Sequence, residues 1–505
     1  MRGWGTEKRL GGRGGSPAAA AAAAAVRIGA GRLGLLPLLL LLCLALALLP
    51  AGRAAAAAPA GVPAGVVATE VSFAGVGGIA LHGTVVAPAA RGAAGVHPGL
   101  VMLPGAGPGG RAELRTAAEA YARHGVVTLI YDKRTAGYST IHRDYSLLAG
   151  DALAALHLLQ QRPDVDRGRV GLWGLSEGAW PASLAAGRSA DVAFLITAGA
   201  VGLTPAQQQA WAYGEFLRHH QVSGSLLSTL QNTSTRQLVG AGLFPEADYD
   251  PLPAWEQVHQ PVLALWGDLD REAAPAESSQ LIRQALDRGG NTHYTIHFVP
   301  GVRHNLNLTA DGGFDRPSTL PADYADYESS WIRRLGNGGV LPPASVDPAP
   351  PQDRQSQALA PLRGYESPWL QLAALLLFAA GFAGYPLVGA VRMLRGGRRP
   401  APLGRPARWL AGAGLAATVG TLGYLLFSVL TAANLIGPVL LGRPLPWLAA
   451  QCLAVVTVVA AGCTAIAWRR SRPVLSWSER TRLGLLLAAG AVFVPWALYW
   501  GLLLP

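Results

Sequence analysis

The fold is decided by the stretch RVGLWGLSEGA, which runs from Arg169 to Ala179. Its apolar part, Val170–Trp173, is short and carries no charge, which is typical of a buried strand. The pentapeptide GLSEG around Ser176 follows and has the pattern G-x-S-x-G. The next residues, Ala179–Gly187, are mostly small and favour a helix. A strand, a sharp turn at a serine and a helix form the context in which this pattern indicates an exposed nucleophile.

Short apolar runs alternate with helical patterns on both sides of this stretch, which favours a mostly parallel sheet with crossover helices. We expect strands at Val66–Phe73, Ile79–Val86, Gly99–Leu103, Val126–Tyr131, Val170–Trp173, Val192–Thr197, Val262–Trp266 and Tyr294–Val299. We expect helices at Ala112–His124, Leu147–Gln161, Ala179–Gly187 and Pro275–Asp287. The predicted fold class is therefore α/β, with helices on both faces of the sheet.

One long segment, residues 203–260, interrupts this alternation. It contains a helical pattern over Gln207–His220 and an acidic turn over Glu246–Asp250. We predict that it forms a helical cap over the site, inserted between two late strands.

The other residues of a catalytic triad are expected just after the late strands. Asp268 and Asp270 both follow the strand that ends at Trp266, and we prefer Asp270 because the second residue after the turn points back toward a base. His304 lies in a glycine-containing loop after the last strand and is the predicted base. The order serine, aspartate, histidine is that of an α/β-hydrolase triad.

Two backbone N–H groups are predicted to form an oxyanion hole. The N–H of Glu177 lies at the start of the helix after the serine, where unpaired N–H groups favour negative charge. The glycine-rich loop LPGAGPGG, residues 103–110, supplies the second donor. We prefer Ala106, and Gly105 or Gly107 stay open as alternatives; the simplest other interpretation of this loop is a flexible turn.

Residues 65–336 resemble the α/β-hydrolase superfamily, and within it the dienelactone-hydrolase and prolyl-oligopeptidase-like bacterial hydrolases. Besides the Ser176 motif, the resemblance rests on YDKR at 131–134 with GYS at 137–139, GDLD at 267–270 and PGVRH at 300–304. It implies hydrolysis of an ester, thioester or peptide without a cofactor. Pro104 departs from the pattern, because many members have histidine before the oxyanion glycine.

The two ends of the chain are apolar, and only 14% of all residues are charged. Residues 1–60 combine basic groups, an apolar run and a small-residue stretch, as a cleaved signal peptide or an uncleaved signal anchor would. Residues 61–336 form the predicted hydrolase domain, and the Pro-rich residues 337–368 a linker. Within 369–505, four apolar segments have the length of membrane spans: 369–391, 409–435, 446–468 and 483–504.

The charge distribution predicts how these spans are oriented. The chain has a net charge of +11, but residues 66–338 carry roughly −5, so the surplus lies beside the apolar segments. This argues against a nucleic-acid partner, which needs a basic surface on the soluble domain. Arginines cluster between the first and second spans and between the third and fourth. The positive-inside rule therefore predicts a multi-pass protein of the cell membrane with its hydrolase domain outside the cytoplasm.

These features together predict a membrane-anchored serine hydrolase that cleaves an ester or related acyl bond of a small molecule. No histidine, aspartate or glutamate spacing suggests a metal, and there is no phosphate-binding loop. One alternative is a serine peptidase for short peptides, in which Glu246, Asp248 or Asp250 would hold the peptide N-terminus. Another is a membrane protein that binds a ligand without turnover. The sequence does not indicate an oligomeric state.

Overall fold

The structure, a computed structural model, describes residues 65–89, 95–107, 109–335, 341, 343–396, 404–471 and 476–505. The predicted signal segment, residues 1–60, lies outside the described residues.

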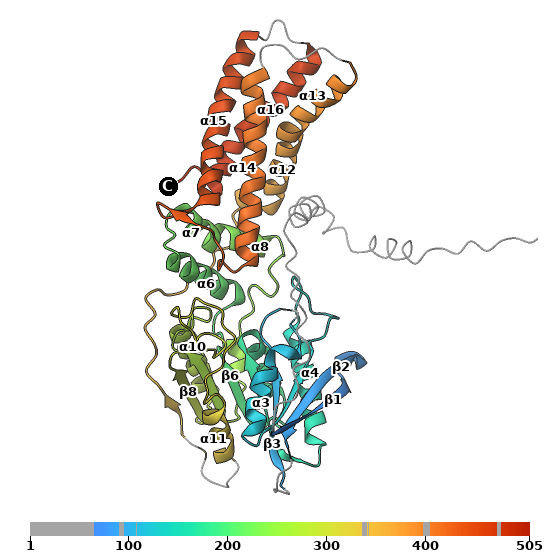
Figure 1. Ribbon diagram of the computed structural model, residues 1–505, viewed down its shortest axis with the longest axis vertical. Helices are drawn as coiled ribbons and strands as arrows, with labels where there is room; N and C mark the ends of the chain where they lie inside the picture. The colour runs from blue at the N-terminus through green and yellow to red at the C-terminus, as the bar shows by residue number, and fades with distance from the viewer. Residues whose placement is uncertain are drawn as a thin grey trace, which may run out of the picture. The chain divides into compact units, whose positions relative to one another are not determined.

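A large sheet forms the centre of the α/β domain (Figure 1). Within the described residues it has nine strands in the order β1-β2-β4-β3-β5-β6-β7-β8-β9. The strands are β1 Val66–Ala74, β2 Ala80–Pro88, β3 His97–Leu103, β4 Val127–Tyr131, β5 Val165–Leu175, β6 Leu195–Ala198, β7 Val262–Gly267, β8 Tyr294–Val299 and β9 Ser345–Val346. Strand β2 is antiparallel to β1 and β4, and all other pairs are parallel. This arrangement confirms the predicted α/β-hydrolase fold.

Two apolar cores form because successive side chains of a strand point to opposite faces of a sheet. Val101 and Leu103 of β3 belong to one core, and Leu100 and Met102 to the other. The first core is covered by α4 Tyr145–Gln160, α5 Ala179–Arg188 and α10 Pro275–Arg288, and the second by α3 Arg115–Arg123 and α11 Asp326–Leu335. Helices therefore cover both faces, as predicted.

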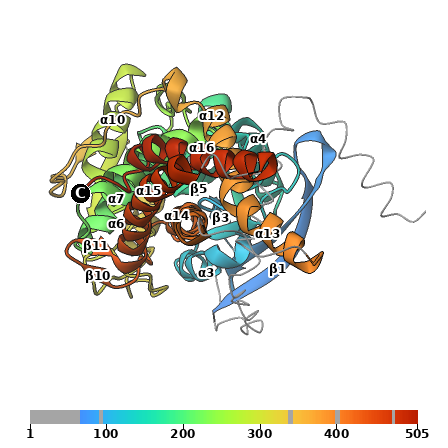
Figure 2. The same ribbon diagram turned by 90° about the horizontal axis from the view of Figure 1, so that it is seen from above.

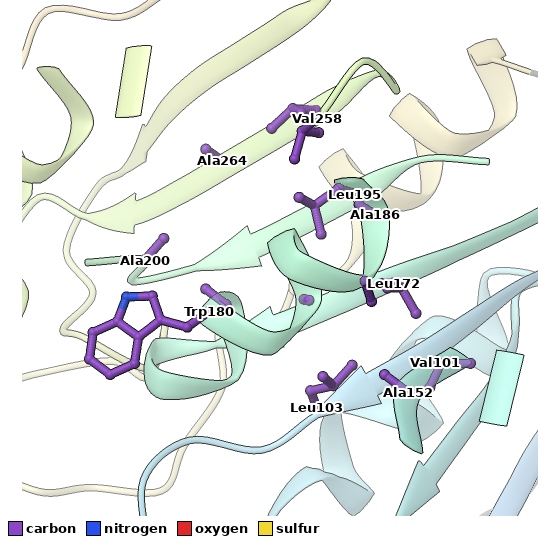
Figure 3. Close-up of a cluster of buried hydrophobic side chains, with 14 of the residues drawn as sticks. Val101, Leu103, Ala152, Leu172, Trp180, Ala186, Leu195, Ala200, Val258 and Ala264 are labelled. Atoms are coloured by element: carbon purple, nitrogen blue, oxygen red, sulfur yellow. The ribbon is translucent and has the colours of Figure 1, made fainter. Parts of the chain in front are cut away.

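The first core lies directly beneath the helix that follows the serine turn (Figure 3). Trp180, in the first turn of α5, is buried, and its indole N–H donates to the carbonyl of Val201 at 3.0 Å. Replacing a buried tryptophan by alanine costs about 3–5 kcal/mol. This side chain therefore fixes α5, and with it the serine turn, against the strands.

Local features differ from the sequence-based expectation, and the largest shift of a strand boundary is that of β5, which begins at Val165 rather than at Val170. Strand β6 begins at Leu195 rather than at Val192, because Val192 and Phe194 already lie in the connection from α5. Helix α11 was not predicted, although it buries Trp331 and Ile332. Within the segment expected to be a linker, β9 pairs with β8 in parallel at the edge of the sheet.

Short helices form the segment between β6 and β7. They are α6 Pro205–His219, α7 Ser225–Ser228, a π-helical turn Thr229–Ser234, α8 Thr235–Gly240 and α9 Leu252–Trp255. Helix α6 begins where it does because the Thr204 hydroxyl accepts a hydrogen bond from the Gln207 N–H, and because proline is favoured in the first turn. We refer to residues 203–260 as the cap.

Four helices of the C-terminal region are long and apolar enough to cross a membrane. The first consists of α12 Pro368–Phe378, a π-helical turn Ala379–Ala383 and α13 Gly384–Leu394; the others are α14 Gly404–Leu430, α15 Leu445–Ser471 and α16 Trp477–Tyr499. Helices α14 and α15 pack side by side in both views (Figures 1 and 2). Hydroxyls such as those of Thr418, Thr457 and Thr464 donate to carbonyls four residues earlier. These three hydroxyls are thus satisfied within their own helices, as a lipid environment would require. We refer to these helices as the bundle.

The cap contacts one end of the bundle through hydrogen bonds. Gln237 donates to the carbonyl of Glu366 and to the Tyr499 hydroxyl, both at 2.6 Å. The Thr229 hydroxyl donates to the carbonyl of Trp500 at 3.2 Å. Arg236 and the Glu366 carboxylate form an ion pair with two N–O distances of 2.9 and 2.6 Å. These partners lie just before the first helix of the bundle and at the end of the last.

Candidate active site

Ser176 lies in a strained turn between β5 and α5. Its φ is +51°, a left-handed conformation that is rare for residues other than glycine. A Cβ on Gly174 would lie 2.6 Å from the Gly178 carbonyl oxygen, and one on Gly178 would lie 2.5 Å from the Leu103 carbonyl oxygen. Both positions therefore require glycine, which explains the motif physically. Strained backbone of this kind persists where the surrounding structure enforces it, commonly at functional sites.

The structure brings Asp270 and His304 together. Asp270 follows β7 and His304 follows β8, and the carboxylate Oδ2 lies 2.8 Å from the imidazole Nδ1. Only 1% of Asp270 and 7% of His304 is exposed. The other carboxylate oxygen accepts hydrogen bonds from the N–H groups of Glu272 and Ala273 at 2.7 and 2.9 Å. The carboxylate is thereby fixed toward the imidazole.

Asp268, the competing candidate, has a different position. Its carboxylate accepts a hydrogen bond from the Gly301 N–H at 2.8 Å, which ties the turn after β7 to the turn after β8. It is paired with backbone and not with the histidine. The preference for Asp270 therefore agrees with the geometry.

The protonation of this pair follows from burial and mutual attraction. Burial alone would lower the pKa of His304, but the charges of Asp270 and Glu272 and the hydrogen bond to Asp270 raise it above its ordinary value of 6.5. Burial alone would raise the pKa of Asp270, but the His304 charge and the hydrogen bonds keep it below 3.8. Asp270 is thus a carboxylate at neutral pH, and His304 titrates above 6.5.

Strand register brings the turn of Ser176 next to the turn that holds the histidine ring. Leu175 and Ala198 are partners on the neighbouring parallel strands β5 and β6, and Ser176 and Gly199 follow them where the two strands end. Gly199 has φ +60°, and a Cβ there would lie 2.8 Å from Nδ1 and Cε1 of His304. The imidazole therefore rests on Gly199, one strand away from the serine. Within the described residues, the serine hydroxyl and His304 do not form a hydrogen bond.

The glycine-rich loop after β3 lies against the serine turn. A Cβ on Gly105 would be 3.6 Å from the Cβ of Ser176. The Gly107 N–H donates to the Tyr138 hydroxyl at 3.0 Å, so it is not free to bind an oxyanion. Within the described residues, no backbone hydrogen bond uses the Ala106 N–H. These contacts favour Ala106 over Gly107 as the donor from this loop.

A second buried cluster surrounds the side chain of Glu177, a residue for which the sequence predicted a role of the N–H alone. The residue is 2% exposed. Its Oε1 accepts from Lys133 at 3.0 Å and from the Tyr138 hydroxyl at 2.6 Å, and its Oε2 lies 2.6 Å from a guanidinium nitrogen of Arg143. Lys133 and Tyr138 belong to the YDKR and GYS motifs. The sequence signal for this cluster is Glu177 itself: an acidic residue within an otherwise apolar strand–turn–helix needs polar or cationic partners.

The three acidic residues of the cap turn 246–250 lie apart from these contacts. Glu246, Asp248 and Asp250 are all exposed, and the Asp250 carboxylate accepts a hydrogen bond from the N–H of Leu252 at 3.0 Å. Tyr249, between them, packs on Tyr145 and Trp180 at ring distances of 4.8 and 5.8 Å. The cap therefore presents an aromatic side chain, not an acid, to the helices beside the serine turn. Among the described residues, no group of three or more histidine, cysteine, aspartate or glutamate side chains is placed to hold a metal ion.

Comparison with known proteins gives likeness in structure alone. No family model matches the sequence, and no curated protein does. A structure of DcsB in complex with its substrate analogue is 19% identical over 54% of this chain and 100% of that one, with a TM-score of 0.39. A dienelactone hydrolase from Anabaena variabilis is 18% identical over 54% and 98% of the two chains, with a TM-score of 0.35. The acylaminoacyl peptidase of Pyrococcus horikoshii is 17% identical over 49% and 39%, also at 0.35.

Proposed function

We propose that this protein is a membrane-anchored serine hydrolase in which Ser176 is the nucleophile, His304 the general base and Asp270 the residue that orients the base. The observation that carries the proposal is the buried 2.8 Å contact between Asp270 and His304, one strand away from a serine with positive φ. A nucleophile, a base and a residue that orients the base are the parts of an acyl-transfer site.

The proposed reaction has two halves. His304 removes the hydroxyl proton as the Ser176 oxygen attacks the acyl carbon, and the N–H groups of Glu177 and Ala106 bind the oxyanion, each contributing about 3 kcal/mol. The intermediate collapses, the alcohol leaves with the proton from His304, and an acyl-serine remains. Water then attacks the acyl carbon, His304 takes its proton, and the acid departs as the serine regains a proton.

An ester or related acyl substrate is favoured over a peptide by the cap. The acidic residues expected to hold a peptide N-terminus, Glu246, Asp248 and Asp250, are exposed. The Tyr145, Trp180 and Tyr249 rings suit an apolar group instead. A third possibility, ligand binding without turnover, gives no reason for the Asp270–His304 pair.

The proposed location is the outer face of the cell membrane. The cap contacts residues next to the start of the first bundle helix and the end of the last, Glu366 and Trp500. Eight described arginines lie at the other ends of the helices: Arg392, Arg395, Arg405, Arg408, Arg469, Arg470, Arg480 and Arg482. Because positive loops stay in the cytoplasm, this arrangement supports a catalytic domain outside.

Labelling of the full-length protein by a fluorophosphonate tests the catalytic proposal. We expect labelling of the native protein and none in Ser176→Ala. Ser183→Ala is the matched control, because Ser183 is a buried serine of the following helix whose hydroxyl donates to the Trp180 carbonyl. A folded native protein that stays unlabelled would instead favour ligand binding. Comparing p-nitrophenyl esters with aminoacyl nitroanilides then separates esterase from peptidase.

A reporter fusion tests the orientation. A periplasm-active reporter fused after Ser345 is expected to be active, whereas the same reporter after Gly396, beside the arginine-rich loop, is expected to be silent. The opposite pattern would contradict the outside placement.

A further inference from the structure

Lys133 is a lysine in a chain whose cationic side chains are almost all arginines. Lys8 and Lys133 are the only lysines among 505 residues, and all other basic side chains except histidine are arginines. Its side chain is only 6% exposed. The ammonium donates to the carbonyl of Gly105, to the Tyr138 hydroxyl at 3.0 Å, to the Glu177 carboxylate at 3.0 Å and to the carbonyl of Gly107 at 3.3 Å. A compact ammonium can share its donors among such partners, whereas a planar guanidinium directs them in a fixed fork.

Two of these partners are carbonyls of the loop beside Ser176. In a trans peptide unit, the C=O and the following N–H point in opposite directions. By fixing the Gly105 carbonyl, Lys133 therefore also fixes the direction of the Ala106 N–H. Tyr138 fixes the next unit, because its hydroxyl accepts from the Gly107 N–H at 3.0 Å.

The same cluster reaches the turn that carries the nucleophile. The Tyr138 hydroxyl donates to Glu177 at 2.6 Å, and Glu177 directly follows Ser176. One cation thus connects the two segments whose N–H groups would have to converge on a single oxygen. Lys133 and Arg143 are positive and Glu177 is negative, and Glu113 acts on Lys133 as a second negative charge.

Burial has an opposing effect that the cluster must overcome. It lowers the pKa of Lys133, and the Glu177 charge and hydrogen bond act against this shift. Glu177 therefore favours the charged form of the lysine.

We propose that Lys133, supported by Tyr138 and Glu177, is a positioning residue that orients the Ala106 N–H and so assembles the oxyanion hole of the hydrolase proposed above. The expected effect on kinetics rests on that proposed function, whereas the expected effect of Lys133 on the loop after β3 does not. Lys133 is not expected to touch the substrate.

Kinetics of full-length variants provide the first test. We expect Lys133→Met to lower kcat by about 10²-fold with KM changed little, because the donor acts only in the transition state. A trifluoromethyl ketone, which forms an oxyanion on the serine, should lose affinity in the same proportion. Lys133→Arg retains the charge but not the shape, and we expect it to restore little. Arg162→Met, which removes a cation from the ion pair with Asp164 near the start of β5, is the control.

Amide hydrogen exchange provides a test that does not depend on catalysis. In Lys133→Met and Tyr138→Phe, peptides covering Leu103–Gly107 should exchange faster, while those covering β7 stay unchanged. Unchanged exchange in this loop, or a kcat of Lys133→Arg close to the native value, would overturn the inference. If the loop loosens but the native protein is not labelled by a fluorophosphonate, the proposed function fails while the structural role of Lys133 stands.

Discussion

Two of the buried pairs of ionisable side chains in this molecule, each in its own region, differ in how their charges are used. At the carboxyl ends of the strands, which we call the sheet edge below, Asp270 faces His304 near a serine with positive φ. Between the cap and the bundle, Arg236 faces Glu366, with side chains only 11% and 8% exposed. Both contacts are short and shielded from water.

The difference lies in what can change. Arg236 divides its donors among the Glu366 carboxylate and the carbonyls of Ala360 and Pro361, and a guanidinium stays charged at any pH that the protein tolerates. His304, in contrast, can gain and lose a proton near neutral pH. A buried ion pair by itself therefore indicates a structural contact. A pair that includes a titratable residue next to a nucleophile indicates a catalytic site.

The largest expected effect comes from breaking the pair at the sheet edge. Asp270→Asn should lower kcat/KM by about 10⁴-fold, because the amide holds the imidazole in the wrong tautomer. The unfolding temperature should change little, since the amide oxygen can still accept the N–H groups of Glu272 and Ala273. Ester hydrolysis and thermal unfolding of the same preparation measure both quantities.

The neighbouring aspartate is the control for that experiment. Asp268→Asn retains an oxygen for the Gly301 N–H, so activity should stay within about threefold of the native value. If Asp268→Asn were the more damaging variant, the assignment of the acid would be wrong.

A smaller effect is expected in the pH dependence of the fluorophosphonate reaction. The base must be neutral, so the rate falls as pH drops through the pKa of His304, which lies above 6.5. In Asp270→Asn the charge that raises this pKa is lost, and the residual rate should fall only at lower pH. If the pH at which the rate falls is the same in Asp270→Asn and in the native protein, Asp270 does not set the pKa of His304.

Breaking the pair between the cap and the bundle should affect stability and not chemistry. Arg236→Met, Glu366→Gln and the double variant form a cycle for which we expect a coupling of about 1–2 kcal/mol, between the values of exposed and fully buried pairs. The kcat should stay within about threefold. If Arg236→Met or Glu366→Gln lowered kcat without lowering stability, the pair between the cap and the bundle would have a catalytic role and not a structural one.

The sequence predicted one region far better than the other, for a physical reason. The serine turn, Asp270 and His304 stand at the ends of strands, where the local pattern of strand, turn and helix specifies the position of each residue. The contacts of Arg236 and Gln237 join residues more than 120 positions apart and have no motif. The partners of Glu177 were missed for the same reason, since Lys133 lies 44 residues before it. Strand β9 pairs by backbone alone, so its side chains gave no sign of it.

The smallest effect on activity is expected at a buried carboxyl group that has no cation partner among the described ion pairs. Among the described ion pairs none includes Glu328, which is 5% exposed, and burial raises its pKa from 4.5 to about 7. The unfolded chain releases this proton at lower pH than the folded one, so stability falls as pH rises from 4.5 to about 7, by up to about 3 kcal/mol. Glu328→Gln should leave kcat unchanged and abolish this part of the pH dependence of unfolding. If kcat fell in Glu328→Gln, a buried ionisable group with neither a cation partner nor a neighbouring nucleophile would also affect catalysis in this fold.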